Sequence, residues 1–303
     1  MRPVTYTGPM KPIRVACVRY LNTVPMIEGL DKLSGITLTP VVPAGIAGMV
    51  LRDEADIGLV SLVDAARAPE PGLALLPVGM IGCDGPTLTV RVFSSVPLEQ
   101  IRQLHADTDS HTSVILAQVL LSRLYGTRPT VIDFDARERI AVGTQHAGFA
   151  AANSQHSLDE AWPETLLLIG DKVVTDSPPA VRYPHQLDLG EAWKRLTGLP
   201  FVYAMWACRA DRAAAPEILL AAQLLERQRR HNQTRIDWIV AKHAPEHRWP
   251  RDLAATYLGN YLRFEVGPRE REAAERFIAE AETLGLVRGR LTWAEIEAVA
   301  ESR

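Results

Sequence analysis

Apolar and polar positions along the chain follow two patterns, one typical of buried strands and one typical of amphipathic or buried helices. Short β-branched runs at residues 13–18, 36–42 and 55–60 are each followed by a helical pattern. Strands that alternate with helices indicate a parallel sheet covered on both faces. The beginning of the chain therefore predicts an α/β fold, in which residues 19–23 lie where such folds place ligand contacts.

The middle of the chain continues this alternation with a second set of elements. Residues 143–157, rich in Gly, Ala, Asn, Gln and His, are predicted as a loop with irregular helical turns. The strands are predicted at 73–77, 87–95, 130–134, 165–169 and 201–208, and the helices at 97–104 and 189–196.

The last third of the chain has helical periodicity almost throughout. Helices are predicted at 217–230, 236–243, 252–264 and 268–284, and residues 292–295 form a capping box that would open one more. We predict two lobes, one made of residues 1–96 plus 199–303 and one made of residues 97–198. Two crossings of the chain between lobes would create a hinged cleft, which is a preferred place for a small ligand.

Residues 107–113 form a polar segment that opens into the apolar run 114–125. Ser110, Thr112 and Ser113 suit a helix N-cap, and Gly126 suits the helix end. Backbone N–H groups, hydroxyls and the positive end of the helix dipole would meet there and hold a carboxylate or phosphate. An ordinary capped helix that binds nothing uses the same residue types and stays open as the alternative.

Composition and charge exclude several classes of protein. The chain of 303 residues is 47% apolar and carries a net charge of −3, so nucleic acid or an anionic membrane is not an expected partner. Residues 1–12 lack the apolar stretch of a signal peptide, and we expect a cytoplasmic protein. The three cysteines are far apart and show no metal-ligand spacing, so we expect neither a disulfide framework nor a metal site.

Several motifs, taken in order and spacing, resemble the chorismate dehydratase family of the futalosine route to menaquinone. They cover residues 13–209, and the helical tail is also similar. The motifs are Tyr20-Leu-Asn-Thr23, Gly58-Leu-Val-Ser61, Asp84-Gly-Pro86, Thr112-Ser-Val114, Leu168-Ile-Gly-Asp171 and Thr197-Gly-Leu-Pro-Phe-Val-Tyr-Ala204 with Trp206.

The resemblance implies a two-lobed fold like that of type II periplasmic binding proteins. It implies a hydro-lyase that removes water from chorismate to give 3-[(1-carboxyvinyl)oxy]benzoate, without a cofactor or metal. A sister family, which releases dihydroxynaphthoate from a cyclic futalosine, carries a His-Glu pair at the position of Gly170-Asp171. The absence of a histidine there favours the dehydratase side.

The chain also departs from the family pattern. Arg19 and Asp109 stand where serines are common, His111 where an arginine is common, and Thr89 where the family has a serine. The segment 136–163 is longer than in the family. These departures concern the substrate pocket and therefore the detail of substrate recognition.

The family match implies the residues of the site. Asn22 and Thr89 match catalytic positions, where an amide and a hydroxyl would orient the substrate. The implied substrate-binding residues are Ser61, Ser110, His111, Thr112, Ser113 and Asp171, of which Asp171 would organise its loop. Each polar residue also has a purely structural reading: Asn22 can hold its own turn, Thr89 can be a strand former, and Ser61 can be an N-cap.

The catalytic base has two candidates. His111, in the first turn of a helix, would be kept neutral by the helix dipole, as a proton acceptor requires. The matched motifs contain no carboxylate or histidine that must be the base, so the enolpyruvyl carboxylate of the substrate is the candidate we favour. His146 could reach the cleft only if its loop folds over it.

A binding protein of another class competes with the enzyme. The same cleft could capture an aromatic or dicarboxylate ligand without reaction, in a cytoplasmic sensor. Turnover of chorismate distinguishes the two functions.

Overall fold

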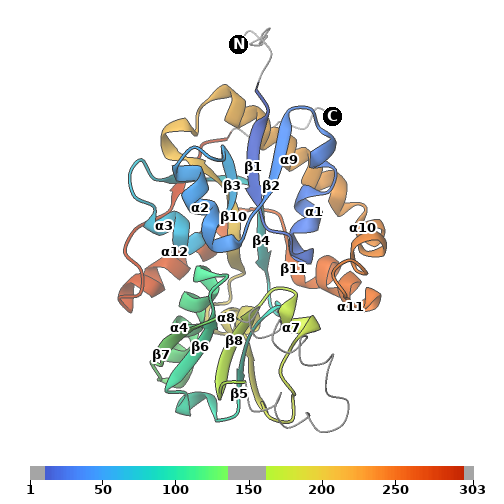
Figure 1. Cartoon of the computed structure of the whole chain (residues 1–303). Coiled ribbons are helices and arrows are strands. Elements are labelled where there is room, and N and C mark those ends of the chain that lie inside the picture. Colours follow the sequence, from blue (N-terminus) through green and yellow to red (C-terminus); the bar gives the residue numbers. More distant parts are fainter. Residues whose placement is uncertain (1–10, 136–161, 297–303) are drawn as a thin grey trace.

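The computed structural model of the protein describes residues 11–135 and 162–296 (Figure 1). Two β-sheets, of seven and five strands, form the centres of two lobes that lie one above the other in Figure 1. The predicted α/β fold with two lobes is confirmed. The predicted loop at 143–157, with His146, lies outside the described residues.

The larger sheet has the strand order β11-β4-β10-β3-β1-β2, and β12 pairs with β4. β1 lies between β2 and β3 in parallel, whereas β10 runs antiparallel to both β3 and β4. The bounds are β1 Ile13–Cys17, β2 Ile36–Pro40, β3 Ile57–Ser61, β4 Leu73–Cys83, β10 Phe201–Arg209, β11 Leu262–Arg263 and β12 Thr292–Trp293.

Helices cover both faces of this sheet. Gly58 in β3 allows α2 to approach closely, because a Cβ at this position would lie 2.5 Å from Cγ2 of Ile46. The first-lobe helices are α1 Val24–Ile27, α2 Pro43–Leu51, α3 Leu62–Arg67, α9 Pro216–Gln233, α10 Ile236–His243, α11 Arg251–Thr256 and α12 Pro268–Thr283, with short turns η1 Leu21–Thr23, η2 Leu30–Lys32 and η4 Ala210–Arg212 and the π-helical turn η5 Tyr257–Tyr261.

The smaller sheet has the order β7-β6-β8-β5-β9. Its centre is a fully buried strand, β8, which pairs parallel to β6 and antiparallel to β5. The elements of this lobe are β5 Val90–Ser94, η3 Leu98–Gln100, β6 Gln103–Asp107, α4 His111–Tyr125, β7 Thr130–Phe134, β8 Thr165–Ile169, α7 Lys172–Thr175, β9 His185–Asp188 and α8 Leu189–Thr197.

The strand β5 belongs to the smaller sheet, although the sequence assigned residues up to 96 to the first lobe. The chain therefore leaves the larger sheet after Cys83 and not near residue 97. Asp188 fixes this crossing, because its carboxylate accepts hydrogen bonds from the backbone N–H groups of Thr87 and Leu88, at 2.9 and 2.7 Å. This carboxylate also caps α8 and so joins the entry of the lobe to its exit.

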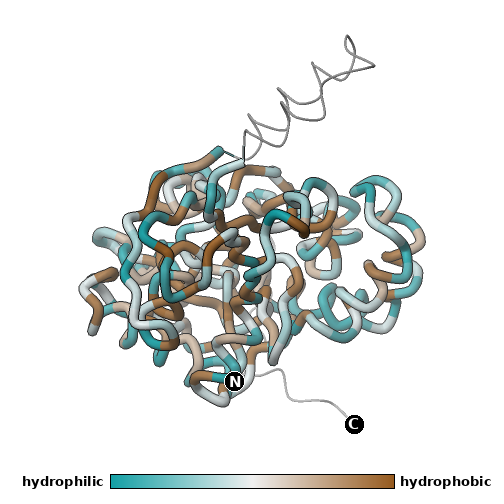
Figure 2. Tube along the Cα trace, turned by 90° about the horizontal axis from the view of Figure 1, so that it is seen from below, coloured by the Kyte–Doolittle hydropathy of each residue, from teal (hydrophilic) through white to brown (hydrophobic). Residues whose placement is uncertain are grey.

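Aromatic residues pack the two lobes together on one side. Trp193 of α8 and Phe277 of α12 meet Phe201 of β10 edge to face, with ring centroids 5.5 and 5.0 Å from it. All three side chains are buried. Hydrophobic segments lie mostly inside the tube trace and hydrophilic ones mostly outside (Figure 2).

One predicted helix and one predicted helix start are wrong, and residues 297–303, which would continue the latter, lie outside the described part of the chain. Residues 97–104 form the short turn η3 and the beginning of β6. The apolar side chains of Ile101 and Leu104 are buried in this non-helical segment. The predicted capping box at 292–295 forms β12 instead, because Ala294 N–H donates to the carbonyl of Leu75 and continues the sheet edge. The other predicted strands and helices are present, with ends shifted by a few residues.

Among the described residues, no helix combines the length and the apolarity that a membrane span needs.

Candidate ligand cleft between the lobes

A cleft between the two lobes brings together five of the residues predicted from the sequence. Asn22 and Ser61 come from the first lobe, and Thr89, Ser110 and Ser113 come from the second. Thr87, Tyr20, Tyr203 and Tyr257 add further hydroxyl groups to the lining. Among the described residues that line the cleft, none carries a charged side chain.

The mouth of α4 opens into this cleft. Ser110 is the N-cap: its Oγ accepts a hydrogen bond from Ser113 N–H at 3.2 Å and lies 2.9 Å from Ser113 Oγ. Gly126 ends the helix in the left-handed conformation, with φ of 68°. The predicted capped helix is confirmed, and it directs the positive end of a 15-residue helix dipole to the cleft. Binding of an anion at this mouth stays a prediction.

The side chains of His111 and Thr112 lie outside the cleft lining. Thr112 is fully buried, and its Oγ1 accepts a hydrogen bond from Val63 N–H at 3.2 Å. His111 Nδ1 lies 2.6 Å from Oδ1 of Asp64, and 45% of its side chain is exposed. The predicted substrate contacts of these two side chains are therefore replaced by contacts between the lobes.

The pairing with Asp64 also changes the charge expected for His111. A hydrogen bond that His111 donates to the Asp64 carboxylate raises the pKa of His111 above its usual value, and partial burial acts in the opposite direction. The sequence predicted a neutral imidazole because of the helix dipole. The nearby carboxylate outweighs this effect and favours the imidazolium.

Ser61 has both of the roles that the sequence left open. It is the N-cap of α3, where its Oγ accepts from Asp64 N–H at 3.2 Å, and it also lines the cleft. Its hydroxyl hydrogen is donated to Oδ2 of Asp64 at 2.8 Å. Since a serine has one O–H donor, Ser61 presents the cleft with an acceptor.

Asn22 and Thr89 reach the cleft from opposite lobes. The Oδ1 of Asn22 accepts a hydrogen bond from Thr23 Oγ1 at 3.1 Å, which leaves the amide nitrogen as its donor for other groups. Thr89 Oγ1 lies 2.7 Å from the phenol oxygen of Tyr257.

Tyr257 is a cleft residue that sequence reasoning missed. Burial raises the pKa of its phenol, and hydrogen bonds from Thr89 and Asn22 act against this shift. The π-helical turn η5 begins at Tyr257, and such turns are frequent at functional sites. An aromatic residue in a helical run is typical of a packed core, so no local pattern indicates a role in the cleft.

A buried charge cluster lies behind the mouth of α4, and the sequence did not predict it. Lys172 Nζ lies 2.5 Å from Asp107 and 2.8 Å from Asp109, and the phenol of Tyr20 donates to Asp109 at 2.8 Å. Burial raises the pKa of Asp107, while Lys172 acts against this shift. Asp109, one of the departures from the family pattern, thus has a cationic partner.

The carboxylate of Asp171 points away from the cleft and into the first lobe. It accepts hydrogen bonds from Leu21 N–H at 3.3 Å, from Trp249 Nε1–H at 3.1 Å and from His247 Nδ1 at 2.7 Å. Its neighbour Gly170 lines the cleft. Asp171 itself is not among the lining residues, and the predicted role in organising its loop fits these bonds.

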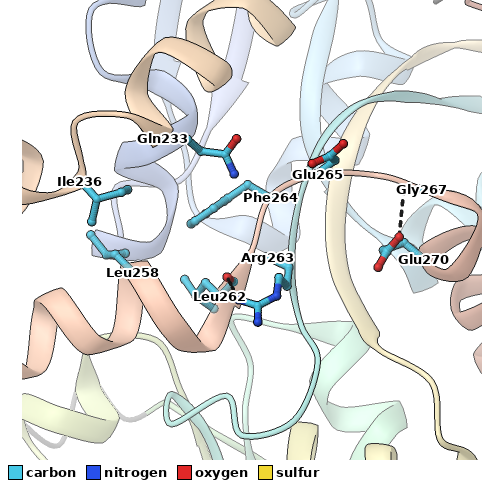
Figure 3. A pocket seen from close by; sticks show the side chains of 10 residues that line it. Gln233, Ile236, Leu258, Leu262, Arg263, Phe264, Glu265, Gly267 and Glu270 are labelled. Carbon is cyan, nitrogen blue, oxygen red and sulfur yellow. Dashed lines mark hydrogen bonds between the residues drawn. The ribbon is translucent and has the colours of Figure 1, made fainter.

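A second pocket, of about 410 Å³, lies on the first lobe beside η5 and β11 (Figure 3). None of the predicted site residues lines it. Arg263 donates to the backbone oxygens of Asn260 and Leu262, and Glu270 accepts from Gly267 N–H at 2.9 Å. Arg263 and Glu270 of this pocket thus serve local structure, and the cleft between the lobes, which holds the predicted residues, is the better candidate site.

No group of three or more histidine, cysteine, aspartate or glutamate side chains suited to a metal ion occurs in residues 11–135 and 162–296. The cleft chemistry in this part of the chain is that of neutral hydroxyls, amides and a helix mouth. Such groups bind and orient an anion or a polar ring without adding charge.

Comparison with known proteins identifies a family and a relative of similar length. A family model described as menaquinone biosynthesis matches residues 13–283. A chorismate dehydratase of Thermus thermophilus is 27% identical to the chain over 291 residues, which cover 91% of this chain and 97% of the relative.

Solved structures with the same arrangement are much more distant in sequence. A protein of Archaeoglobus fulgidus is 15% identical with a TM-score of 0.62, and the match covers 91% of this chain and 98% of the other. The periplasmic aliphatic sulphonate binding protein of Escherichia coli is 12% identical with a TM-score of 0.59, and the match covers 93% and 96%. The fold is therefore that of periplasmic binding proteins, as the sequence predicts.

Proposed function

The chain belongs to the menaquinone biosynthesis family, and on this premise we propose that it is a chorismate dehydratase, a carbon–oxygen lyase that converts chorismate to 3-[(1-carboxyvinyl)oxy]benzoate and water. The relative from Thermus thermophilus bears this activity in its name and aligns with nearly the whole chain. The proposed partner is thus a small molecule with two carboxylates.

One observation carries the proposal: in a chain of this family, the cleft is lined by neutral hydrogen-bonding groups around the mouth of α4. Chorismate needs a pocket that holds two carboxylates and one hydroxyl. The helix mouth at Ser110 and Ser113 suits a carboxylate, and the acceptor oxygen of Ser61 suits the hydroxyl.

The reaction requires one C–H bond and one C–O bond to break. The proton leaves the carbon that bears the enolpyruvyl ether, and its electron pair forms a new double bond in the ring. The neighbouring hydroxyl takes up the proton that the base has removed and departs as water, and the ring becomes aromatic. Because no proton is gained or lost overall, the protein must supply a fixed position for the substrate and a base placed next to the proton that leaves.

We assign the base to the enolpyruvyl carboxylate of the substrate. The described residues that line the cleft include no carboxylate and no histidine, and His111 is turned towards Asp64. In this scheme, Asn22 and Thr89 orient the substrate so that its own carboxylate reaches the proton. Tyr257 holds Thr89 in place through their 2.7 Å contact.

The lack of a carboxylate or histidine among the described residues of the lining also favours a second candidate function. A non-catalytic sensor would capture an aromatic or dicarboxylate ligand in the same cleft and release it unchanged. The fold is shared with binding proteins, so the fold does not distinguish a sensor from an enzyme.

Identification of the product tests the proposal. The purified protein is incubated with chorismate, and the mixture is analysed by NMR and mass spectrometry. We expect the aromatic vinyl ether and the loss of one water molecule from the substrate. Recovery of unchanged chorismate from a folded protein that binds it would contradict the enzyme and favour the sensor.

A further inference from the structure

We propose that Asp171 is a positioning residue that makes assembly of the cleft depend on closure of the two lobes. The inference rests on the proposed function, because its activity test uses chorismate. It concerns the second lobe, where Asp171 precedes α7, and the first-lobe segments that meet this residue (Figure 1).

Both oxygens of the Asp171 carboxylate are occupied by groups of the first lobe. Oδ1 accepts from Trp249 Nε1–H at 3.1 Å, and Oδ2 contacts His247 Nδ1 at 2.7 Å. Leu21 N–H lies 3.3 Å from each oxygen. The Asp171 side chain of the second lobe thus joins two segments of the first lobe, one at Leu21 and one at residues 247–249. These hydrogen bonds require that the two lobes lie against each other.

The bond to Leu21 controls the placement of Asn22. Leu21 and Asn22 are consecutive residues of the short turn η1, and Asn22 presents its amide to the cleft. The side chain of Tyr20, the N-cap of this turn, makes no capping hydrogen bond to it, whereas the Asp171 carboxylate from the other lobe binds the first N–H of the turn. Movement of this carboxylate would move the turn.

The bond to Trp249 controls the placement of Tyr257. Trp249 is 5% exposed and stacks on the Tyr257 ring, with centroids 4.8 Å apart and planes 20° apart. Tyr257 in turn contacts Thr89 of the second lobe at 2.7 Å. Asp171 therefore acts on two cleft residues of the first lobe, through Leu21 on Asn22 and through Trp249 on Tyr257, and Tyr257 carries the effect to Thr89 of the second lobe.

The position of Asp171 suits a clamp. The lobes pack through apolar contacts of α8 and β10 with α12, where Trp193, Phe201 and Phe277 meet. In Figure 1 α12 lies at the left of the first lobe, and α7 lies farther to the right, beside α11. The hydrogen bonds of Asp171 thus lie apart from the apolar contact at α12, as a clamp and a hinge do.

Asp176 offers a matched control. It lies in the segment that follows α7 and also pairs across the lobes, with Arg248 at 3.0 Å. Arg248 is 68% exposed, and no contact between this pair and Asn22 or Tyr257 occurs among the described residues. An effect of general attachment between the lobes would appear in both variants, whereas a positioning effect would appear only in Asp171→Asn.

A double-mutant cycle tests the proposal through chorismate turnover. Residues that act through each other show non-additive losses. We expect Asp171→Asn to lower kcat/KM by about 10-fold or more in the wild-type background and by less than about 3-fold in an Asn22→Ala background. Asp176→Asn should stay within about 2-fold of wild type. Additive losses, or an equal loss in Asp176→Asn, would overturn the proposal.

Two further measurements keep the outcome interpretable. If Asp171→Asn does not fold, Trp249→Phe removes the Nε1–H donor while it keeps an aromatic ring, and we expect it to lower kcat in the same non-additive way.

Small-angle scattering without ligand should give a larger radius of gyration for Asp171→Asn than for wild type and Asp176→Asn; equal radii would contradict the clamp. A wild-type protein that leaves chorismate unchanged would refute the proposed function and leave the scattering test of the clamp valid.

Discussion

Asn22 presents an amide to a cleft that we expect to hold two carboxylates. We predict that Asn22→Asp keeps the fold and lowers kcat by about 10-fold or more. The reason is repulsion, since like charges about 4 Å apart repel by ~1 kcal/mol in water and by ~4 kcal/mol at an intermediate effective dielectric. Steady-state kinetics with chorismate, together with a melting curve, measures both quantities.

Asn260→Asp is the matched control for this substitution. Asn260 is exposed and lies outside the cleft lining, so the same change of charge should leave turnover within about 2-fold of wild type. Unchanged turnover of a folded Asn22→Asp variant would show that Asn22 does not face the substrate.

His111 is a surface contact between lobes in this structure and not a group of the cleft. We predict that His111→Asn keeps a substantial part of the activity, because the substrate carboxylate takes the proton. A general base is worth about 10²–10⁴ in rate. A loss of that size in kcat, with an unchanged melting temperature, would instead establish His111 as the base.

The same variant carries a pH signature. The pKa of His111 is raised above 6.5 by its hydrogen bond to Asp64, so the pair stabilises the fold fully below the unfolded pKa and loses this effect as the pH rises through the folded pKa. The stability difference between wild type and His111→Asn should therefore be larger at about pH 5.5 than at about pH 8.5. Since the side chain is 45% exposed, we expect at most about 1 kcal/mol. Urea unfolding at both pH values measures it, and a difference that grows with pH would contradict the pairing.

The place of a single polar residue in the cleft was predictable where that residue lies at the end of a strand or at the beginning of a helix. Asn22, Ser61 and Ser110 follow a strand or begin a helix, and the cleft contains all three. Tyr257 was not predictable, because only a π-helical turn and the stacking on Trp249 bring its hydroxyl to the cleft. Long-range packing of this kind leaves no local pattern in the sequence.

Ser110 is both the N-cap of α4 and a candidate contact for the ligand. We predict that Ser110→Ala lowers the free energy of unfolding by about 1 kcal/mol, as the loss of an N-cap does, and also raises KM for chorismate. Ser122→Ala in the same helix is the control, and we expect a stability change within about 0.5 kcal/mol and an unchanged KM. A loss of stability with an unchanged KM would make Ser110 a cap and nothing more.

Elements with a clear period were predicted well, and elements decided by edge pairing were not. The apolar run of α4 ends at Gly126 as the sequence indicates. The residues Leu98, Ile101 and Leu104 have helical spacing, yet the pairing of β6 with both β7 and β8 turns the end of this segment into a strand. Periodicity reports which side chains are buried, and the partner strand decides the backbone that buries them.

At the scale of the whole molecule, the two-lobed plan was predictable but its boundary was not. Alternating strands and helices on both sides of the cleft indicate two layered units. The boundary depends on Asp188, which binds the backbone of Thr87 and Leu88 from a hundred residues away and thereby brings β5 into the smaller sheet. Such a contact is specified by geometry and not by the local residue pattern.

The central claim is that the closed cleft turns over chorismate repeatedly. The most direct measurement follows the diene absorbance of chorismate with the protein present at about one hundredth of the substrate concentration. We expect the absorbance to fall to completion, which requires many turnovers per protein molecule, and the rate to scale with protein concentration. Absorbance that stays constant, or that falls by no more than one substrate molecule per protein molecule, would contradict the claim.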